Sequence, residues 1–356
     1  MTERVYMKGN EALAYGALKA KLNAYFAYPI TPSTEIPETL AKEFGSEQYP
    51  DFRVFLQAAS EIEAVNMVLG AAAGGVRVMT ATSSPGFSLK QEALSYAAGM
   101  ELPLLIVNVN RGGPGLGNIA PEQGDYFQMT KGGGHGSYHL IVLAPNSVQE
   151  MASFPKIAFD LAFKYRNPAC IAGDAFTGQL KEDIVFPTIQ ASEYDVSSWA
   201  TTGASGRERH VINSMNLDPE IHVTHETRLN EKYKMIQRHE VRYESHLTDD
   251  AETVIAAYGI TSRICKSVVN KLRGEGSKIG LFRPITLWPF PYDQILKLTE
   301  HVKRFLVVEL NTGQMVEDVR LGVEGKARIN FFGKVGGLLP TEREIEKDLT
   351  KEMIAA

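Results

Sequence analysis

The stretch VFLQAASEIEAVNMVLGAAAGG, residues 54–75, joins two local patterns. It opens with a short apolar run that is typical of a buried strand. From residue 61 onward, apolar and small residues recur every three or four positions, which predicts an amphipathic helix. We expect its core face to hold Ile62, Val65, Val68, Leu69 and Ala72. Glu61 and Glu63 stand at the join, where the chain otherwise enters a core, and their presence there needs a reason.

The same strand-then-helix unit recurs along the first half of the chain. Short apolar runs alternate with amphipathic patterns such as EALAYGALKAKL and SLKQEALSYAAG. Near-continuous apolar strands separated by helices predict an α/β fold, with a parallel sheet covered by helices on both faces. The predicted strands are 24–30, 53–59, 77–83, 104–110, 139–145 and 168–174.

The alternation stops near Pro187 and resumes at residue 252. We therefore predict a first domain over 1–187, a polar connector over 188–249 and a second, smaller α/β domain over 250–356. Within the connector, 228–247 is predicted to be a charged helix. Its apolar stripe consists of Leu229, Tyr233 and Ile236.

Composition restricts the class of protein. The 356 residues are 44% apolar and 22% charged, as in globular proteins with a buried core. A net charge of −5 gives no reason to expect nucleic acid or an anionic membrane as partner. The longest apolar runs are too short to span a bilayer, and the N-terminal pattern predicts no signal peptide. The two cysteines, Cys170 and Cys265, are isolated, which predicts buried thiols in the cytoplasm and any redox centre on another chain.

The segment YPITPSTE (28–35) follows a predicted strand, at the end where open α/β sheets bind ligands. Pro29 and Pro32 fix the backbone on both sides of Thr31. Helix capping explains the two hydroxyl residues that follow Pro32. It does not explain Thr31, which is therefore a candidate ligand contact.

The segment 110–136 follows another predicted strand and is rich in glycine, so its backbone can approach a ligand closely. Arg111 offers a planar guanidinium for a carboxylate. No helix is predicted to open after these glycines, which disfavours a dinucleotide fingerprint and an NAD site. His135 and His139 have no third ligand at metal spacing, so we interpret them as polar loop residues and expect no metal ligands in this chain.

The segment TATSSPGFSLKQEA (80–93) is a third strand end with hydroxyl groups. Ser83 or Ser84 is a candidate ligand contact, although a turn or a helix cap explains either one equally well. The segment lacks the G-x-S-x-G elbow of serine hydrolases. Glu61 lies just past a strand end too, where the helix dipole favours a carboxylate, and Glu63 is expected to face solvent or a partner.

Taken together, these segments resemble the α subunit of the 2-oxoacid:ferredoxin oxidoreductases, and the resemblance extends over nearly the whole chain. It is carried by GNEALAYGAL, YFAYPITPSTEIPE, FLQAASEIEAVNMVLGAAAGG, TSSPGFSLKQEALSYAAGMELP, VNVNRGGPGLGN, LAPNSVQEM and ELNTGQMVEDVR. The resemblance implies a thiamine-diphosphate enzyme that makes acyl-CoA from a 2-oxoacid and CoA. It also implies a thiamine-diphosphate-binding type of first domain and a second domain like the C-terminal domain of transketolase.

The resemblance also implies roles for single residues. Glu61 would contact the pyrimidine ring of the cofactor, with Pro29, Ser83 and Ser84 as further cofactor contacts. Thr31 and Arg111 would line the substrate pocket, with Arg111 pairing the substrate carboxylate. By this resemblance the catalytic residues of the chain are Glu61, Thr31 and Arg111.

The resemblance further implies partner chains. The Gly-Asp-Gly motif that holds Mg2+ and the diphosphate is missing, and GDAFTGQ (173–179) does not replace it. We therefore expect a β subunit to carry that half of the site, and γ and ferredoxin-like subunits to carry the iron–sulfur clusters. The expected assembly is a dimer of hetero-oligomers that reduces ferredoxin.

The substrate and the function class leave alternatives. The loop with Gly-Leu-Gly at 115–117 is most similar to the branched-chain (2-oxoisovalerate) type, and the 2-oxoglutarate type is the alternative. A non-catalytic scaffold subunit is a rival of another class. A nicotinamide dehydrogenase is a third, disfavoured by the missing fingerprint.

Overall fold

All six apolar segments predicted as strands in the first half form strands of one sheet. The computed structural model describes residues 4–186 and 192–354. In the seven-stranded sheet the order is β12-β6-β7-β5-β4-β2-β3, and every neighbouring pair is parallel except β12 with β6. The strands are β2 (Ala24–Ala27), β3 (Val54–Gln57), β4 (Val78–Thr82), β5 (Leu105–Asn110), β6 (Ile141–Leu143), β7 (Ala169–Asp174) and β12 (Thr286–Trp288).

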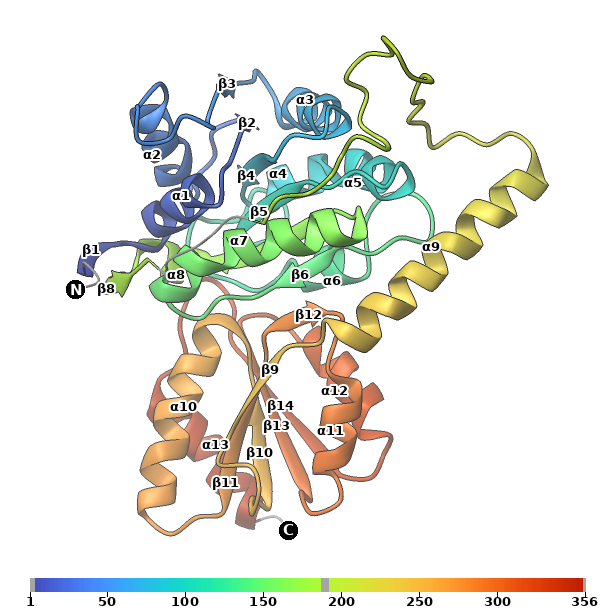
Figure 1. The fold of residues 1–356 in the computed structure, drawn as a ribbon. Helices are drawn as coiled ribbons and strands as arrows, with labels where there is room; N and C mark the ends of the chain where they lie inside the picture. Colours follow the sequence, from blue (N-terminus) through green and yellow to red (C-terminus); the bar gives the residue numbers. More distant parts are fainter. Residues whose placement is uncertain (1–3, 187–191, 355–356) are drawn as a thin grey trace.

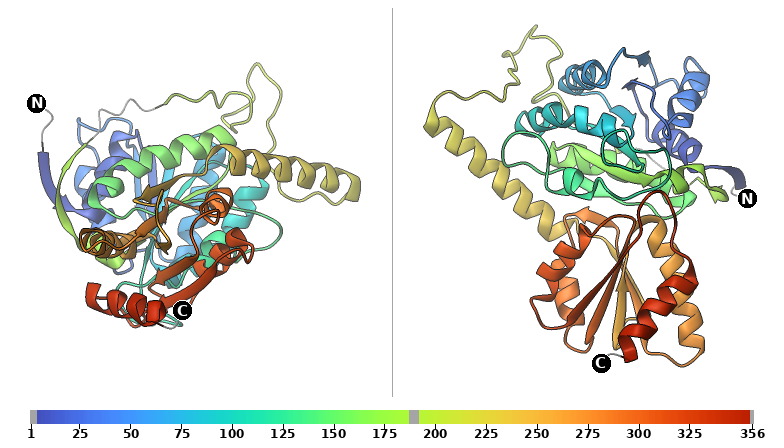
Figure 2. Two further views of the ribbon diagram at one scale, coloured as in Figure 1. Left: turned by 90° about the horizontal axis from the view of Figure 1, so that it is seen from below. Right: turned by 180° about the vertical axis from the view of Figure 1, so that it is seen from behind.

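Helices cover this sheet in two groups on opposite faces (Figures 1 and 2). On one face α1 packs against α2 and α7, and on the other α3 packs against α4 and α5. Their bounds are α1 (Gly9–Lys19), α2 (Glu35–Glu43), α3 (Glu61–Ala73), α4 (Ser84–Leu89), α5 (Gln91–Gly99) and α7 (Val148–Tyr165). Short elements complete this part: β1 (Arg4–Lys8) pairs with β8 (Lys181–Val185), and α6 (Tyr126–Thr130) and α8 (Ala175–Gln179) lie in loops.

Two predictions about burial at residues 54–75 are wrong. Strand β3 was predicted to be buried, but it is the edge strand of the sheet, with Val54 41% and Leu56 39% exposed. Helix α3 buries Val65, Val68, Leu69 and Ala72 as predicted, but the prediction for Ile62 is wrong, because the core stripe begins at Glu61 and Ile62 is 51% exposed. The buried positions Glu61, Ala64, Val65, Val68, Leu69 and Ala72 follow the helical spacing from Glu61.

The connector contains one long helix whose predicted bounds are shifted. Helix α9 spans Pro219–His239, whereas the sequence predicts 228–247. Asp218 caps its first turn and Pro219 occupies the first helical position, a pair of start signals upstream of the charged run. The apolar stripe of Leu229, Tyr233 and Ile236 is buried as predicted. Figures 1 and 2 show α9 running along the molecule toward the junction of the two large sheets.

The second half builds a five-stranded sheet in the order β14-β13-β10-β11-β9, and β9 is antiparallel to β11. Its strands are β9 (Tyr243–His246), β10 (Thr253–Ala256), β11 (Ile279–Pro284), β13 (Arg304–Glu309) and β14 (Arg328–Gly333). Figure 1 shows α10 and α13 on one side of this sheet and α11 and α12 on the other. These helices are α10 (Gly259–Gly274), α11 (Tyr292–Leu298), α12 (Met315–Val323) and α13 (Glu342–Ile354). The predicted fold class, two α/β units with mainly parallel sheets, is confirmed.

The predicted domain limits stay a prediction. Pro187 lies outside the described residues. Strand β12 of the second half is an edge strand of the first sheet, and β9 of the predicted connector belongs to the second sheet. The two units are therefore joined by strands as well as by the connector. In the described part of the chain, none of the helices has the length and apolar character needed to cross a membrane.

Candidate active site

Three of the predicted contact residues meet at one edge of the first sheet. Thr31, Ser84 and Arg111 follow the carboxyl ends of β2, β4 and β5, which are neighbours in the sheet. The Arg111 guanidinium donates through Nη1 to the Thr31 carbonyl at 2.8 Å. The Arg111 backbone N–H donates to Ser84 Oγ at 3.0 Å. The carboxyl edge of a parallel sheet is where open α/β folds bind ligands, so this edge is the candidate active site.

The Arg111 guanidinium carries a charge that no protein acid neutralises within the described residues. Nη2 donates to the Leu116 carbonyl at 3.1 Å, and the buried Nε has no partner. Both Nη contacts are therefore to neutral carbonyl groups. A guanidinium held in this way is suited to a carboxylate ligand.

The loop around Arg111 depends on close approach of its own backbone. A Cβ at Gly117 would lie 1.7 Å from the Gly112 carbonyl oxygen, and the φ of Gly117 is +57°. Glu122 fixes the loop to the second unit. Its carboxylate accepts from the backbone N–H of Gly113 in the loop at 3.1 Å and from that of Gly336 in the second unit at 2.7 Å. The glycines predicted to allow close approach therefore also shape the loop itself.

Glu61 is the first residue of α3, and its side chain is directed into the core. The residue is only 6% exposed, and no hydrogen bond or ion pair to its carboxylate occurs within the described ranges. It packs against Gly86 of α4, where an added Cβ would lie 2.7 Å from Glu61 Oε1. A buried carboxylate without a partner is costly, so Glu61 has capacity for a ligand.

Glu63 has a different, structural role. Ser60 Oγ accepts from the Glu63 N–H at 3.2 Å, and Glu63 Oε2 accepts from the Ala59 N–H at 3.0 Å. These contacts satisfy backbone donors at the start of α3 and leave Glu63 exposed. The two acids at the join therefore face opposite environments.

The other predicted cofactor contacts differ in availability. Pro29 is exposed in the loop that carries Thr31. Ser83 is fully buried and its Oγ has no partner in the part of the chain that the structure describes. Ser84 Oγ is already engaged, since it donates to Asp125 Oδ2 in addition to its contact with Arg111. Ser83 is thus the free hydroxyl of the pair.

Two polar residues of the loop were missed by the sequence analysis. Asp125 is buried, and burial raises the pKa of its carboxyl while hydrogen bonds from Ser84, Asn108 and Gln128 oppose that rise. Gln123 ties the loop to the second unit through Tyr258 and Leu310, at 2.9 Å each. The polar run PEQGD (121–125), ten residues after Arg111 in the same loop, was the available signal.

A cavity of about 590 Å³ lies between this loop and the second unit. Arg111 is the one cation that lines it in the described residues, and the acids Glu122 and Asp125 line it as well. From the second unit come Asn311, Thr312, Gln314 and Val335. This volume is within the usual range for small-molecule sites.

A buried lysine was also missed. Lys90 lies between α4 and α5 and is fully buried. In SLKQEALSYAAG it precedes Ala93, Leu94 and Ala97 at the helical core spacing, so its place on an apolar stripe was visible in the sequence.

The remaining sequence candidates are structural. His139 lies in a loop as predicted, and its ring stacks on Trp288 with 4.5 Å between the ring centroids. Asp174 of GDAFTGQ is buried and caps α8 by accepting from the Thr177 N–H at 2.8 Å. Cys170 and Cys265 are buried free thiols, as predicted. No group of three or more metal-binding side chains occurs in the residues the structure describes.

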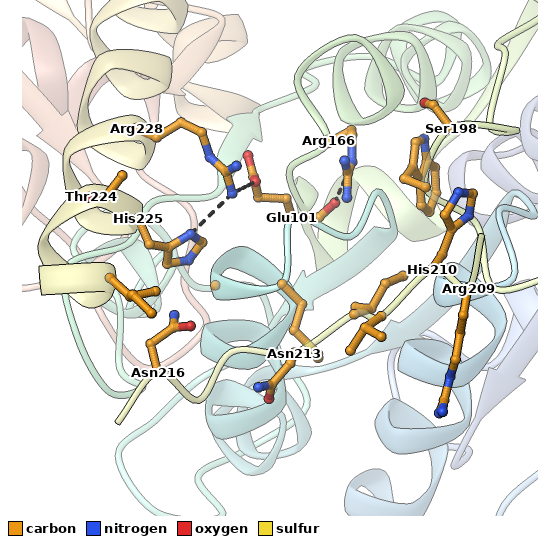
Figure 3. Close-up of a pocket in the computed structure, with 16 residues that line it drawn as sticks. Glu101, Arg166, Ser198, Arg209, His210, Asn213, Asn216, Thr224, His225 and Arg228 are labelled. Atoms are coloured by element: carbon orange, nitrogen blue, oxygen red, sulfur yellow. Dashed lines mark hydrogen bonds and ion pairs between the residues drawn. The ribbon is translucent and has the colours of Figure 1, made fainter. Parts of the chain in front are cut away.

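A second cavity, of about 610 Å³, lies at the opposite edge of the first sheet (Figure 3). Its residues come from the end of α5, the end of α7, the connector and α9, and they include Glu101, Arg166 and Arg228. None of the predicted site residues lines it. Although it is slightly larger, it lies away from the carboxyl ends of the strands, so the cavity beside Arg111 remains the candidate site.

Comparisons with known proteins give the family. Residues 15–259 match the model for pyruvate flavodoxin/ferredoxin oxidoreductase, thiamine diP-binding, and residues 251–345 match that for pyruvate:ferredoxin oxidoreductase core domain II. The chain is 48% identical to the ketoisovalerate oxidoreductase subunit VorB of Methanothermobacter thermautotrophicus, over 95% of each chain. It is 36% identical to the 2-oxoglutarate synthase subunit KorA of Methanothermobacter marburgensis, over 97% of this chain and 98% of the other.

A solved structure agrees with both family models. The chain superposes on the 2-oxoglutarate:ferredoxin oxidoreductase of Magnetococcus marinus with a TM-score of 0.89 and 27% identity. The match covers 99% of this chain and 65% of that one. The higher identity to VorB than to KorA favours the branched-chain type, as the loop at 115–117 had predicted. The chain therefore belongs to the 2-oxoacid:ferredoxin oxidoreductases, and it is more similar to the ketoisovalerate oxidoreductase subunit than to the 2-oxoglutarate synthase subunit.

Proposed function

We propose that this chain supplies the pyrimidine-binding half of a thiamine-diphosphate site and the contacts that hold the substrate carboxylate. The complex would convert a branched-chain 2-oxoacid and CoA to acyl-CoA, CO2 and reduced ferredoxin. The contact between Arg111 and Thr31, 80 residues apart in sequence, is the observation that supports this most. It unites two predicted substrate contacts at the carboxyl edge of the sheet.

The residues present fit the aminopyrimidine of the cofactor. Within the described residues, Glu61 offers a buried carboxylate without a protein partner, and the hydroxyls of Thr82 and Ser83, at the end of β4, are also buried and unpartnered. Such groups are normally satisfied, so their clustering suits a polar ligand. Bound there, thiamine diphosphate would supply a nucleophilic carbon and an electron sink for decarboxylation.

The chain's own residues would act by holding and placing charge. Glu61 would hold a proton against a ring nitrogen, which requires a carboxyl group shielded from water. Arg111 would orient the substrate through its carboxylate. Gly86 leaves room for the Glu61 side chain, and Ser84 fixes the backbone of Arg111.

The charges around the cavity favour a monocarboxylate. A branched-chain 2-oxoacid brings one carboxylate, which Arg111 can match. A second carboxylate, as in 2-oxoglutarate, would meet Glu122 or Asp125 rather than another cation of this chain. Repulsion between like charges in a partly buried site disfavours that substrate.

We propose that partner subunits complete the site. A β subunit would hold Mg2+ and the diphosphate, and further subunits would carry the iron–sulfur clusters. The role of Asp174 as a helix cap supports this division, because it leaves GDAFTGQ without a free acid for a metal. A cytoplasmic location is proposed from the two free thiols.

The decisive experiment compares two neighbouring acids in the purified complex. Glu61→Gln should lower CoA-dependent ferredoxin reduction by at least about 100-fold, the usual size of a lost acid–base contribution. Glu63→Gln, which keeps the cap at the start of α3, should stay close to wild type. Normal turnover of Glu61→Gln in an intact complex would instead support a scaffold subunit.

Two further measurements test the rest of the proposal. The complex should turn over 2-oxoisovalerate faster than 2-oxoglutarate or pyruvate when the three are assayed in parallel. The isolated chain should show no turnover with thiamine diphosphate and substrate, and activity without partners would contradict the split site. A titration with NADH should show no binding, in contrast to a nicotinamide dehydrogenase.

A further inference from the structure

Lys90 is a fully buried cation that the reaction described above does not use. Its Nζ donates to Thr80 Oγ1 at 2.6 Å, and the described residues place no carboxylate within ion-pair distance of it. An ammonium group has three protons to donate. A buried lysine with one neutral partner is rare, because burial of a charge without compensation is costly.

The geometry of β4 and α4 places Lys90 near Glu61, on the side away from the carboxyl edge of the sheet. Gly86 precedes Lys90 by four residues, so both lie on one side of the α4 turn. Thr80 and Thr82, two residues apart in β4, face the same side of the sheet. A Cβ at Gly86 would lie 2.1 Å from Thr82 Oγ1 and 2.7 Å from Glu61 Oε1, so these three groups meet.

Lys90 and Thr80 therefore form a second polar pair. This pair lies further from the carboxyl edge of the sheet than Glu61 and Thr82 do. One helical turn spans about 5.4 Å and two strand residues span about 6.6 Å, so the two pairs are roughly 6 Å apart. Thr82 Oγ1 is buried and has no hydrogen-bond partner in the described residues.

The charges of this column act on each other. Burial lowers the pKa of Lys90 to about 7, and the Glu61 carboxylate opposes that lowering. Helix α3 thus contributes Glu61, β4 contributes only hydroxyls, and no other charged group of the described residues acts on Lys90. Opposite charges this close interact more strongly inside a protein than in water.

We propose that Lys90 is the internal counter-ion of Glu61, a positioning residue that stabilises the carboxylate form of Glu61 from behind. This inference rests on the proposed role of Glu61. The support for this role is the attraction between the buried ammonium and the Glu61 carboxylate. Lys90 would touch neither substrate nor cofactor.

The first test uses the complex without thiamine diphosphate. The apparent pKa of Glu61 is measured from its carboxyl infrared band, assigned by subtracting the Glu61→Gln spectrum. In Lys90→Met, a neutral side chain of similar length, the carboxylate band should replace the carboxylic acid band at a higher pH than in wild type. Lys90→Arg, which keeps the charge, should restore the wild-type value. An unchanged pKa in Lys90→Met would overturn the inference.

A stability measurement covers the case in which Lys90→Met does not assemble. Between about pH 7 and the ordinary lysine pKa of 10.5, the unfolded chain binds a proton at Lys90 that the folded chain does not. Wild-type stability should therefore rise with pH across this window. Glu61→Gln removes the opposing carboxylate, so the rise should begin at lower pH. An identical onset in both proteins would contradict the pairing.

Activity separates this inference from the proposed function. Lys90→Met should retain turnover but move the acidic limb of the kcat–pH profile upward, with KM little changed. If Glu61→Gln were fully active, the proposed function would fail. If Glu61→Gln is inactive but Lys90→Met moves neither the Glu61 pKa nor the profile, only the role of Lys90 fails.

Discussion

The residues of the candidate site carry polar or charged groups whose hydrogen-bonding capacity the protein does not fill. Among the described residues, Glu61 and Ser83 are buried without protein partners, and the Arg111 charge meets only carbonyls. By contrast, the Glu63 carboxylate and the Ser84 hydroxyl already form hydrogen bonds within the protein. Glu63 accepts from a backbone N–H, and Ser84 donates to the Asp125 side chain. Because buried polar groups are normally satisfied, unfilled capacity at one sheet edge is the signature of a ligand site.

Arg111→Met should weaken substrate use. Loss of a charge-assisted hydrogen bond is worth about 1.5–3 kcal/mol, so we expect kcat/KM for the 2-oxoacid to fall by about 10- to 100-fold, mainly through KM. Steady-state kinetics of the complex would measure it. Arg343→Met, on the exposed side of α13, is the matched control and should leave KM unchanged. An unaltered KM in Arg111→Met would remove the substrate-carboxylate role.

At the scale of elements, the site depends on how closely α3 approaches α4. Glu61 starts α3 and Gly86 is in the first turn of α4, and the absent side chain of Gly86 is the room in which the Glu61 carboxylate lies. The pairing also explains why the exposed face of α3 carries Ile62, since the helix turns Glu61 inward. Gly86 thus provides the space that the buried Glu61 side chain occupies.

Gly86→Ala should therefore be harmful where Gly70→Ala is not. A Cβ at Gly86 meets Thr82 Oγ1 at 2.1 Å and Glu61, so we expect a loss of about 1–3 kcal/mol in stability and a large drop in turnover. At Gly70 in α3 nothing lies within 4 Å, and alanine should stabilise by about 0.5–1 kcal/mol. Urea denaturation and turnover assays would measure both. Equal stability of the two variants would contradict this packing.

For the molecule as a whole, polar contacts tie the two α/β units together. Arg283 of β11 is 2% exposed, and its Nη1 donates to Glu150 of α7 at 3.0 Å. Asp318 of α12 accepts from Tyr126 of the first unit at 2.6 Å. Gln123 adds contacts beside the cavity. The cavity therefore has walls from both units, and its shape depends on their junction.

Arg283→Met should destabilise the protein by about 3 kcal/mol. The value is at the lower end for a broken buried pair, because the Glu150 side chain left behind is 23% exposed. Lys278→Met, which removes a surface ion pair with Glu252, should cost less than about 1 kcal/mol. Chemical denaturation of both variants would measure the difference, and equal losses would argue against a buried link at this junction.

The alternation of strands and helices, the family and the loops that carry Thr31, Glu61 and Arg111 could all be predicted from the amino-acid sequence. These are local signals: apolar period, turn residues and motif order are all encoded within short segments. The predicted bounds of α9 are shifted, because the prediction followed the charged run and not the start signals Asp218 and Pro219.

Which of these residues have partners could not be predicted from the sequence, because it depends on how the chain packs. The edge position of β3, the inward turn of Glu61, the engagement of Ser84 by Asp125 and the burial of Lys90 all depend on residues distant in the chain. Burial and hydrogen-bond satisfaction are properties of the packed molecule, since a side chain's neighbours are set by the fold and not by its own segment.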